Sequence, residues 1–439
     1  MRSDSSASGE RTAAPRPAPP RGERAWSARV LWAGGLGNVL EWYDFGLYGL
    51  LAPVLASLFF PNQSRLVALL DVYGGFAAGF AMRPIGAAVL GRVGDRIGRR
   101  SVLVLSVVLM GAATVALGAL PAYASWGLWS PVLLVAIRLL QGFSVGGEFV
   151  GSVTYLVEQA PPGRRGLAGS TANLGATAGL LLAAAAAAGA ASWAGAARLA
   201  AGVWRWPFLF GGVIALAAYL LRRHLPEREV APAPPRRRSP LGQALREAPR
   251  LMLLVTLFTS GYGIADYLTM VFLPTFAHEF GRVSIAAALR ANTAGQALAL
   301  FVVPVAGWLS DRVARRRTIL AAAFFAEAAI AWSAFAWARQ GPGGFYLAQL
   351  AFAGLLALIM GAGPAMLAEQ FPPDYRVTGH AVAFNIGIGV AGGSAPLVAV
   401  ALIRAAAAPM AAAAYLAGAA LLAAITALLL RDRSRQPAI

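Results

Sequence analysis

The chain has 439 residues, of which 58% are hydrophobic and 13% are charged, and it contains no cysteine. Soluble domains carry roughly 25% charged residues, so this composition favours a membrane protein, and the lack of cysteine excludes disulfides, thiol nucleophiles and cysteine-based metal sites. The net charge of +18 comes from arginine, which concentrates in the termini and in one alternating set of loops. This positive-inside pattern predicts two cytoplasmic termini, and it makes the charge a signal of orientation rather than of nucleic-acid binding.

Twelve apolar segments follow one another along the chain, each near the ~20 residues that a hydrocarbon layer about 30 Å thick requires. They lie near 31–58, 69–90, 101–121, 129–157, 167–191, 204–222, 250–277, 286–309, 318–338, 344–368, 380–403 and 409–430. We therefore predict an all-α integral membrane protein in which twelve transmembrane helices form two six-helix bundles.

The parts outside these segments define the predicted domains. Residues 1–28 are rich in Ser, Pro, Ala and Arg and lack an apolar run, which predicts a disordered cytoplasmic tail. Residues 223–249, rich in Pro and Arg, form a cytoplasmic linker between an N-terminal bundle at 29–222 and a C-terminal bundle at 250–430. A second cytoplasmic tail follows at 431–439.

Two loop sequences occur once in each half, in the same order. GRVGDRIGRR at 91–100 corresponds to GWLSDRVARR at 307–316, and EQAPPGRRG at 158–166 corresponds to EQFPPDYR at 369–376. A parallel repeat of this size indicates two similar membrane bundles joined in series. These loops can be simple anchors at the membrane surface, but the repeated spacing favours an ionic latch that closes the cytoplasmic mouth. The predicted latch residues are Asp95, Arg99, Glu158, Arg165, Asp311, Arg315, Glu369 and Arg376, with Glu158 grouped with Arg165 and Glu369 with Arg376.

Acidic side chains inside the apolar segments mark functional positions, because a charge in hydrocarbon costs ~2.5–3.5 kcal/mol. Glu41, Asp44 and Tyr48 have the spacing i, i+3 and i+7, so they share one helical face. Two acids this close suit a group that binds and releases a proton near neutral pH. We favour Asp44, whose neighbours are bulky aromatics, and take Glu41, Glu148 and Asp266 as the other candidates for proton coupling.

Arginines inside the segments are candidates for binding an anion. Arg138, Gln141 and Glu148 share one face of the fourth segment. Arginine stays protonated and offers a planar fork to a carboxylate, so Arg138 can bind an anionic substrate or form a structural ion pair with an acid of the first segment. Glu148 can instead pair with the latch. The substrate-binding candidates are Arg138, Arg83, Gln141, Tyr48, Tyr267 and Asn385.

Two further titratable residues are predicted to have structural rather than functional roles. Glu327, in the ninth segment, is expected to pack against a polar partner. His380 opens the eleventh segment beside the cytoplasmic loop, where a lone histidine is usually interfacial. Three scattered histidines, no cysteine and no His-Glu-x-x-His motif predict neither an enzyme nor a metal site, and no cofactor is expected.

Four motifs in order resemble the metabolite:proton symporter family of the major facilitator superfamily. They are GNVLEWYDF at 37–45, RPIG at 83–86, the loop at 91–100 and RLLQGFSVGGE at 138–148. The resemblance extends from about residue 30 to 430 and weakens in the second half, where Ala314 replaces the glycine of the repeated loop. The family includes citrate, α-ketoglutarate, shikimate and proline/betaine transporters.

The resemblance implies proton-coupled uptake of a small carboxylate-bearing metabolite by alternating access, in a bacterial cytoplasmic membrane. The sequence itself supplies only the buried acids and arginines. A compatible-solute symporter for proline or betaine, a proton-driven exporter and, outside transport, a transporter-like receptor remain alternatives. The expected partners are a small organic acid or zwitterion, protons and the lipid bilayer, and we expect the protein to function as a monomer.

Overall fold

The computed structural model describes residues 28–97, 99–145, 148–161, 163–223, 240–312 and 315–433. The side chains of 28–37, 91, 94–97, 99–100 and 148–149 also lie outside the described part, so those of three predicted site residues, Asp95, Arg99 and Glu148, are not described. All regular structure within the described residues is helical, as the sequence predicts. Of the two predicted tails and the predicted linker, the described part contains residues 28, 223, 240–249 and 431–433.

The N-terminal half crosses from one end of the molecule to the other six times. Its elements are α1 (Ala28–Leu50), α2 (Ala52–Phe59), α3 (Arg65–Ile97), α4 (Arg99–Ala119), α5 (Tyr123–Trp126), α6 (Trp129–Ser144), α7 (Glu148–Gln159), α8 (Arg165–Arg198), the π-helix η1 (Leu199–Val203) and α9 (Arg205–Arg222). The first passage is α1 with α2, and the fourth is α6 with α7.

The C-terminal half repeats this plan after a short helix, α10 (Pro240–Glu247), in the predicted linker. Its elements are α11 (Pro249–Asp266), the π-helix η2 (Tyr267–Phe272), α12 (Leu273–Phe280), α13 (Ile285–Arg312), α14 (Arg316–Gln340), α15 (Pro342–Ala368), α16 (Arg376–Phe384), the π-helix η3 (Asn385–Gly392), α17 (Ala395–Ala406) and α18 (Ala411–Leu429).

Nine spans in the described residues, three of which include a π-helical turn, are long and apolar enough to cross a membrane, and the pair α1–α2, bent by 63°, is a tenth. The other two passages are α6 with α7, and α9. The twelve predicted segments therefore all correspond to helices.

Several passages that the sequence predicts as continuous are broken, and proline explains most of these breaks. Pro53 lies in the first turn of α2, and a proline cannot donate the backbone hydrogen bond that would continue the preceding helix. The π-helix η2 directly precedes the helix that begins with Leu273 and Pro274, and η3 precedes Pro396 in the same way. Such π-helical turns occur frequently at functional sites.

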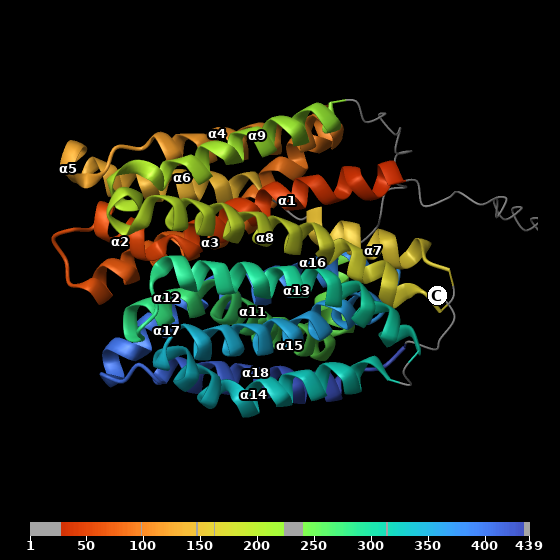
Figure 1. The fold of residues 1–439 in the computed structure, drawn as a ribbon. Coiled ribbons are helices and arrows are strands. Elements are labelled where there is room, and N and C mark those ends of the chain that lie inside the picture. The colour runs from red at the N-terminus through yellow and green to blue at the C-terminus, as the bar shows by residue number, and fades with distance from the viewer. Residues whose placement is uncertain are drawn as a thin grey trace, which may run out of the picture.

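Figure 1 shows two bundles lying side by side with their helices nearly parallel, the N-terminal half in red to yellow-green and the C-terminal half in green to blue. Across the interface α8 packs along α13 and α15, and α3 packs against α17 and η3. The end of the molecule where α7 and α13 end and α8, α14 and α16 begin is named the latch face here. It lies on the right in Figure 1, and the other end is named the opposite face.

Candidate transport site and its two gates

A buried pair of an acid and an arginine lies where α1, α4 and α6 meet. Arg138 Nη1 lies 2.9 Å from Asp44 Oδ2, and both side chains are fully buried. The other carboxylate oxygen, Asp44 Oδ1, accepts hydrogen bonds from Thr114 Oγ1 at 2.8 Å and from Gln141 Nε2 at 2.6 Å. Both oxygens of this acid therefore have partners, and the guanidinium balances its charge.

The Arg138 guanidinium retains donors for a further group. Its Nε and Nη2 atoms have no hydrogen-bond partner among the described residues. Its Cζ atom lies 4.2 Å from the centre of the Tyr48 ring and 4.7 Å from that of Phe45, and aromatic faces attract a cation. The Tyr48 hydroxyl itself donates to the carbonyl oxygen of Val72 at 3.0 Å. Tyr48 thus holds the guanidinium through its ring, while its hydroxyl is already used.

A second pair joins α1 to α3. Arg83 Nη2 is 2.7 Å from Glu41 Oε1, and about a tenth of each side chain is exposed. The Arg83 Cζ atom lies 4.3 Å from the Phe80 ring centre and 4.7 Å from that of Phe45. Phe45 therefore contacts the guanidinium groups of both arginines, and each acid of α1 has its own arginine.

The C-terminal half contributes an aromatic side chain to this cluster. The Tyr267 ring centre lies 5.2 Å from that of Phe80 and 5.7 Å from that of Phe76, and it stacks against Trp42 at 6.2 Å. The buried Tyr267 hydroxyl has no hydrogen-bond partner among the described residues. The acid–arginine pairs of one bundle thus face a tyrosine of the other, which places this cluster at the interface of the halves.

At the latch face, Asp311 joins the two halves. Its carboxylate accepts hydrogen bonds from the backbone N–H groups of Gly166, at 2.7 Å, and Leu167, at 2.9 Å, which belong to the first turn of α8. Negative charge is favourable at a helix N-terminus, because the first N–H groups have no partner within the helix. Arg316 Nη2 lies 2.8 Å from Asp311 Oδ1 and holds the carboxylate in place.

Two ion pairs beside Asp311 cross between the halves. Arg376 Nη1 lies 2.7 Å from Glu158 Oε1, and Arg165 Nη1 lies 3.5 Å from Glu369 Oε1. The sequence repeat makes these two pairs equivalent, with each acid bound to the arginine of the other half. Our grouping of Glu158 with Arg165 and of Glu369 with Arg376 was therefore wrong. Repeats identify equivalent residues, but the packing of the bundles decides which of them meet.

The sequence also selected the wrong arginine next to Asp311. Arg315 is exposed at the start of α14, whereas Arg316 is 2% exposed and bridges Asp311 and Glu369, with its Nη1 atom 2.6 Å from Glu369 Oε2. The side chains of Asp95 and Arg99, the remaining predicted latch residues, lie outside the described part of the structure.

The halves are also in contact at the opposite face. Arg65 and Glu279 form an ion pair at 2.5 Å, and the Tyr73 hydroxyl lies 2.9 Å from Thr275 Oγ1. The sequence analysis predicted none of these four residues, because charged residues such as Arg65 and Glu279 are common near loops and do not indicate a contact between the halves. With contacts between the halves at both ends, the conformation described is closed to both sides.

The other predicted site residues lie apart from the N-terminal cluster. Asn385 donates to the carbonyl oxygen of Ala381, one turn earlier in its own helix, at 2.8 Å. Asp266 is 4% exposed, and its Oδ1 atom has no hydrogen-bond partner among the described residues. Thr114 is a site residue that the sequence analysis missed, because one threonine in an apolar helix gives no signal.

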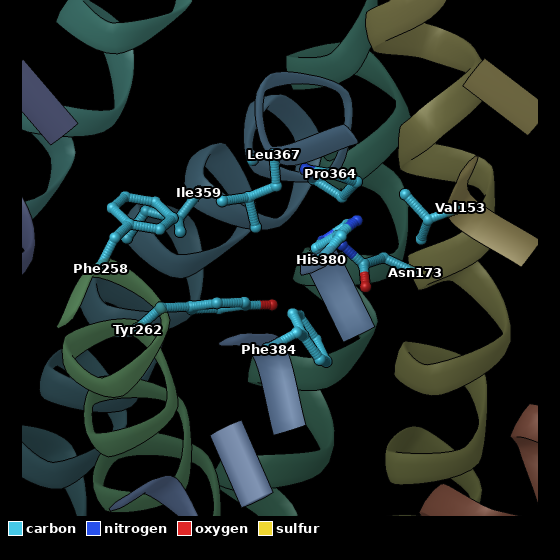
Figure 2. Close-up of a pocket in the computed structure, with 10 residues that line it drawn as sticks. Val153, Asn173, Phe258, Tyr262, Ile359, Pro364, Leu367, His380 and Phe384 are labelled. Atoms are coloured by element: carbon cyan, nitrogen blue, oxygen red, sulfur yellow. The ribbon is translucent and has the colours of Figure 1, made fainter. Parts of the chain in front are cut away.

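The structure differs from the expectations for Glu327 and His380. Glu327 is fully buried, and neither of its carboxylate oxygens has a hydrogen-bond partner among the described residues, so the polar partner expected for it is not found there. His380 is 1% exposed rather than interfacial. Figure 2 shows that its ring lies between Asn173 of the N-terminal half and Tyr262, Phe384 and Pro364 of the C-terminal half.

The chain is similar to known proteins over nearly its whole length. Residues 32–228 match the family described as sugar (and other) transporter, and residues 255–439 match the major facilitator superfamily. The citrate–proton symporter of Klebsiella pneumoniae is 34% identical over 380 residues, covering 84% of this chain and 83% of that protein. The shikimate transporter of Escherichia coli K12 is 31% identical over 416 residues, covering 91% and 93%.

Two further likenesses extend the comparison. The ectoine/proline transporter ProP of Corynebacterium glutamicum is 29% identical over 423 residues, which cover 92% of this chain and 84% of that protein. Among solved structures, the D-xylose–proton symporter superposes with a TM-score of 0.75 at 19% identity, covering 93% of this chain and 98% of that chain. The matched proteins are transporters rather than enzymes. The chain belongs to the major facilitator superfamily and, within it, to the metabolite:proton symporters.

Proposed function

We propose that the protein couples the uptake of a small carboxylate-bearing metabolite to the entry of protons, by alternating access between the latch face and the opposite face. The observation that carries this proposal is the fully buried pair of Asp44 and Arg138, in which the Nε and Nη2 atoms of the arginine have no hydrogen-bond partner among the described residues. We further propose that the latch face and both termini are cytoplasmic, that the membrane is the bacterial cytoplasmic membrane and that the monomer is the working unit.

The pair suggests how one proton and one carboxylate can be coupled. Removing one partner of a buried ion pair leaves an uncompensated charge, which costs several kcal/mol. A proton that binds Asp44 therefore leaves Arg138 without its counter-ion, and a substrate carboxylate can restore the balance by accepting two parallel hydrogen bonds from the Nε and Nη2 atoms. Neither the proton nor the carboxylate alone leaves a balanced site, so this arrangement favours binding both or neither.

The relatives support a carboxylate rather than one particular acid. Citrate, shikimate, ectoine and proline, the compounds named for the relatives, differ in size and net charge, yet each carries a carboxylate group. A symporter for proline or betaine would therefore bind the carboxylate of its substrate through the same Arg138 guanidinium. It would need a second contact for the cationic end, for which the aromatic rings of Trp42 and Tyr267 are available.

A panel of radiolabelled compounds in proteoliposomes tests the proposal. The panel contains citrate, shikimate, α-ketoglutarate, proline and glycine betaine, with xylose as a compound that lacks a carboxylate. We expect at least one carboxylate, and not xylose, to accumulate when the outside is more acidic than the inside, and to equilibrate without accumulating when the gradient is absent. Accumulation of xylose alone, accumulation that ignores the pH gradient, or binding without flux, as in a receptor, would each contradict the proposal.

A further inference from the structure

The intramembrane charges are balanced in one half of the protein and unbalanced in the other. In the N-terminal half, Glu41 and Asp44 each bind an arginine. In the C-terminal half, Asp266 and Glu327 are buried, and neither has an ion-pair partner among the described residues. Asp266 lies on α11 and Glu327 on α14, and these two helices are in contact through the rings of Phe258 and Phe324, whose centres are 5.7 Å apart.

The surroundings of Glu327 supply no positive charge. Helix α14 packs mainly against α15 and α18, which carry no basic residue, and the Phe324 ring of α14 lies 5.7 Å from Phe258 of α11. It also contacts α12 and α13, whose basic residues, His278, Arg290 and Arg312, lie near the ends of those helices. The basic residue of α11 is Arg250, which precedes Asp266 by sixteen positions, about 24 Å along a helix at 1.5 Å per residue. An ionised carboxylate buried in this way is unstable unless a cation accompanies it.

A proton is the cation that fits this place. A metal ion needs several oxygen ligands, typically six to eight for Ca²⁺. The described residues contain no group of three or more acids and histidines that could hold one. A proton needs one carboxylate oxygen and no further ligand, so a buried carboxyl group can hold it.

A chain of titratable groups leads from these acids toward the latch face. Tyr262 lies one turn before Asp266 on α11. Figure 2 shows the Tyr262 hydroxyl pointing toward the space in which His380 lies, and both side chains line one small enclosed cavity between the halves. Neither ring nitrogen of His380 has a hydrogen-bond partner among the described residues. His380 lies one turn from Arg376, which forms the latch pair with Glu158.

The other titratable groups near this route provide no positive charge that would balance the two acids. Tyr267 on η2, Tyr346 on α15 and Tyr415 on α18 are phenols. Asn173, which also lines the cavity, donates to the carbonyl oxygen of Met360 at 2.6 Å. Arg376, the cation nearest to His380 in sequence, is bound to Glu158.

We propose that Asp266 and Glu327 form a second proton-binding site, in the C-terminal half, which exchanges its proton with the latch face through Tyr262 and His380. This inference rests on the proposed proton-coupled transport and adds one proton to each cycle. A proton from the opposite face binds one carboxylate oxygen of the pair. When the latch face opens, the O–H bond of the carboxylic acid breaks and its electron pair stays on the carboxylate. The proton passes to the Tyr262 oxygen while the Tyr262 hydroxyl proton passes to a His380 ring nitrogen, and from there a proton passes to water.

The ratio of protons to substrate tests this site. In proteoliposomes with the membrane potential clamped at zero, each coupled proton allows about a tenfold accumulation of substrate per pH unit. With a gradient of about one unit, we expect the wild type to accumulate the carboxylate identified by the panel up to about 100-fold, and Glu327→Gln up to about tenfold. Asp266→Asn should show the same loss, because the two acids share one proton. Asp374→Asn, which removes an exposed acid at the latch face, should behave as the wild type.

Two further readouts separate this role from misfolding and from the proposed function. Counterflow exchange should persist in Glu327→Gln, and His380→Phe should slow gradient-driven uptake while leaving the final accumulation unchanged. A wild-type limit near tenfold, or an unchanged limit in both acid variants, would overturn the second site and leave the proposed function intact. A wild type that moves no protons would overturn both. If Glu327→Gln does not insert into the membrane, Asp266→Asn decides the question.

Discussion

Replacing Asp311 with asparagine should open the latch face. The carboxylate accepts two backbone N–H groups, from Gly166 and Leu167, and binds the Arg316 guanidinium. Asparagine keeps one acceptor, but it places an amide N–H₂ against the other backbone donor and loses the charge. Hydrogen bonds to charged groups contribute about 1.5–3 kcal/mol each, and Arg316 keeps Glu369 as a partner. We therefore expect a shift of about 2 kcal/mol toward the open state, which is about 30-fold in the equilibrium.

Cysteine accessibility can measure this shift directly, because the natural chain has no cysteine. Val153 is 1% exposed and lines the cavity between the halves under the latch, so a Val153→Cys variant reports opening at that end. The labelling rate with a maleimide, in detergent, is proportional to the open fraction and should rise up to about 30-fold in the Asp311→Asn background. Val271→Cys, on η2 near the opposite face, should show no such rise.

Asp374→Asn is the matched control, since it removes an exposed acid from the neighbouring loop. Labelling of Val153→Cys that stays within twofold after Asp311→Asn would refute the reasoning, because the capped helix would then contribute nothing to closure. An equal rise at Val271→Cys would also refute it, by indicating general loosening of the protein rather than opening of one face.

The remaining predictions concern the guanidinium, a close helix contact and the opposite face. Arg138→Lys should lose most uptake although the charge is kept, because lysine lacks the planar fork, and near-normal initial rates would contradict the carboxylate clamp. Gly166→Val should block closure of the latch face, since a Cβ at this position would overlap the Gly307 carbonyl oxygen, and increased labelling at the latch face without uphill uptake would show this. Neutralising Arg65 or Glu279 should change transport rates by less than about fivefold, because a partly exposed ion pair contributes about 0–1 kcal/mol, and a larger loss would make this pair a principal gate.

The membrane passages could be predicted from the sequence because hydrocarbon thickness imposes a length that hydropathy reveals. The breaks within them were harder to predict. Proline shows where a backbone hydrogen bond is lost, but whether the chain responds with a bend, as before α2, or with a π-helical turn, as in η2, depends on the packing of neighbouring helices.

The candidate site was predicted only in part, and the reasons lie in tertiary contacts. Asp44 and Arg138 stand out because charges are rare in apolar segments, and one alternative left open for Arg138, an ion pair with an acid of the first segment, is the contact observed. Their partner Thr114 could not be found, since nothing in its sequence distinguishes it from other helical threonines. Likewise, the pairing of Glu158 with Arg376 and of Glu369 with Arg165 depends on how the two bundles pack together.

The most direct test of the central claim follows protons and substrate together. Wild-type protein is placed in lightly buffered proteoliposomes without a pH gradient, and the carboxylate identified by the panel is added outside while the external pH is recorded. We predict that substrate entry raises the external pH, and that Asp44→Asn lowers the number of protons that enter with each substrate molecule while still permitting counterflow exchange. Substrate entry by the wild type with no change in external pH would contradict the claim that proton and carboxylate are bound as a pair.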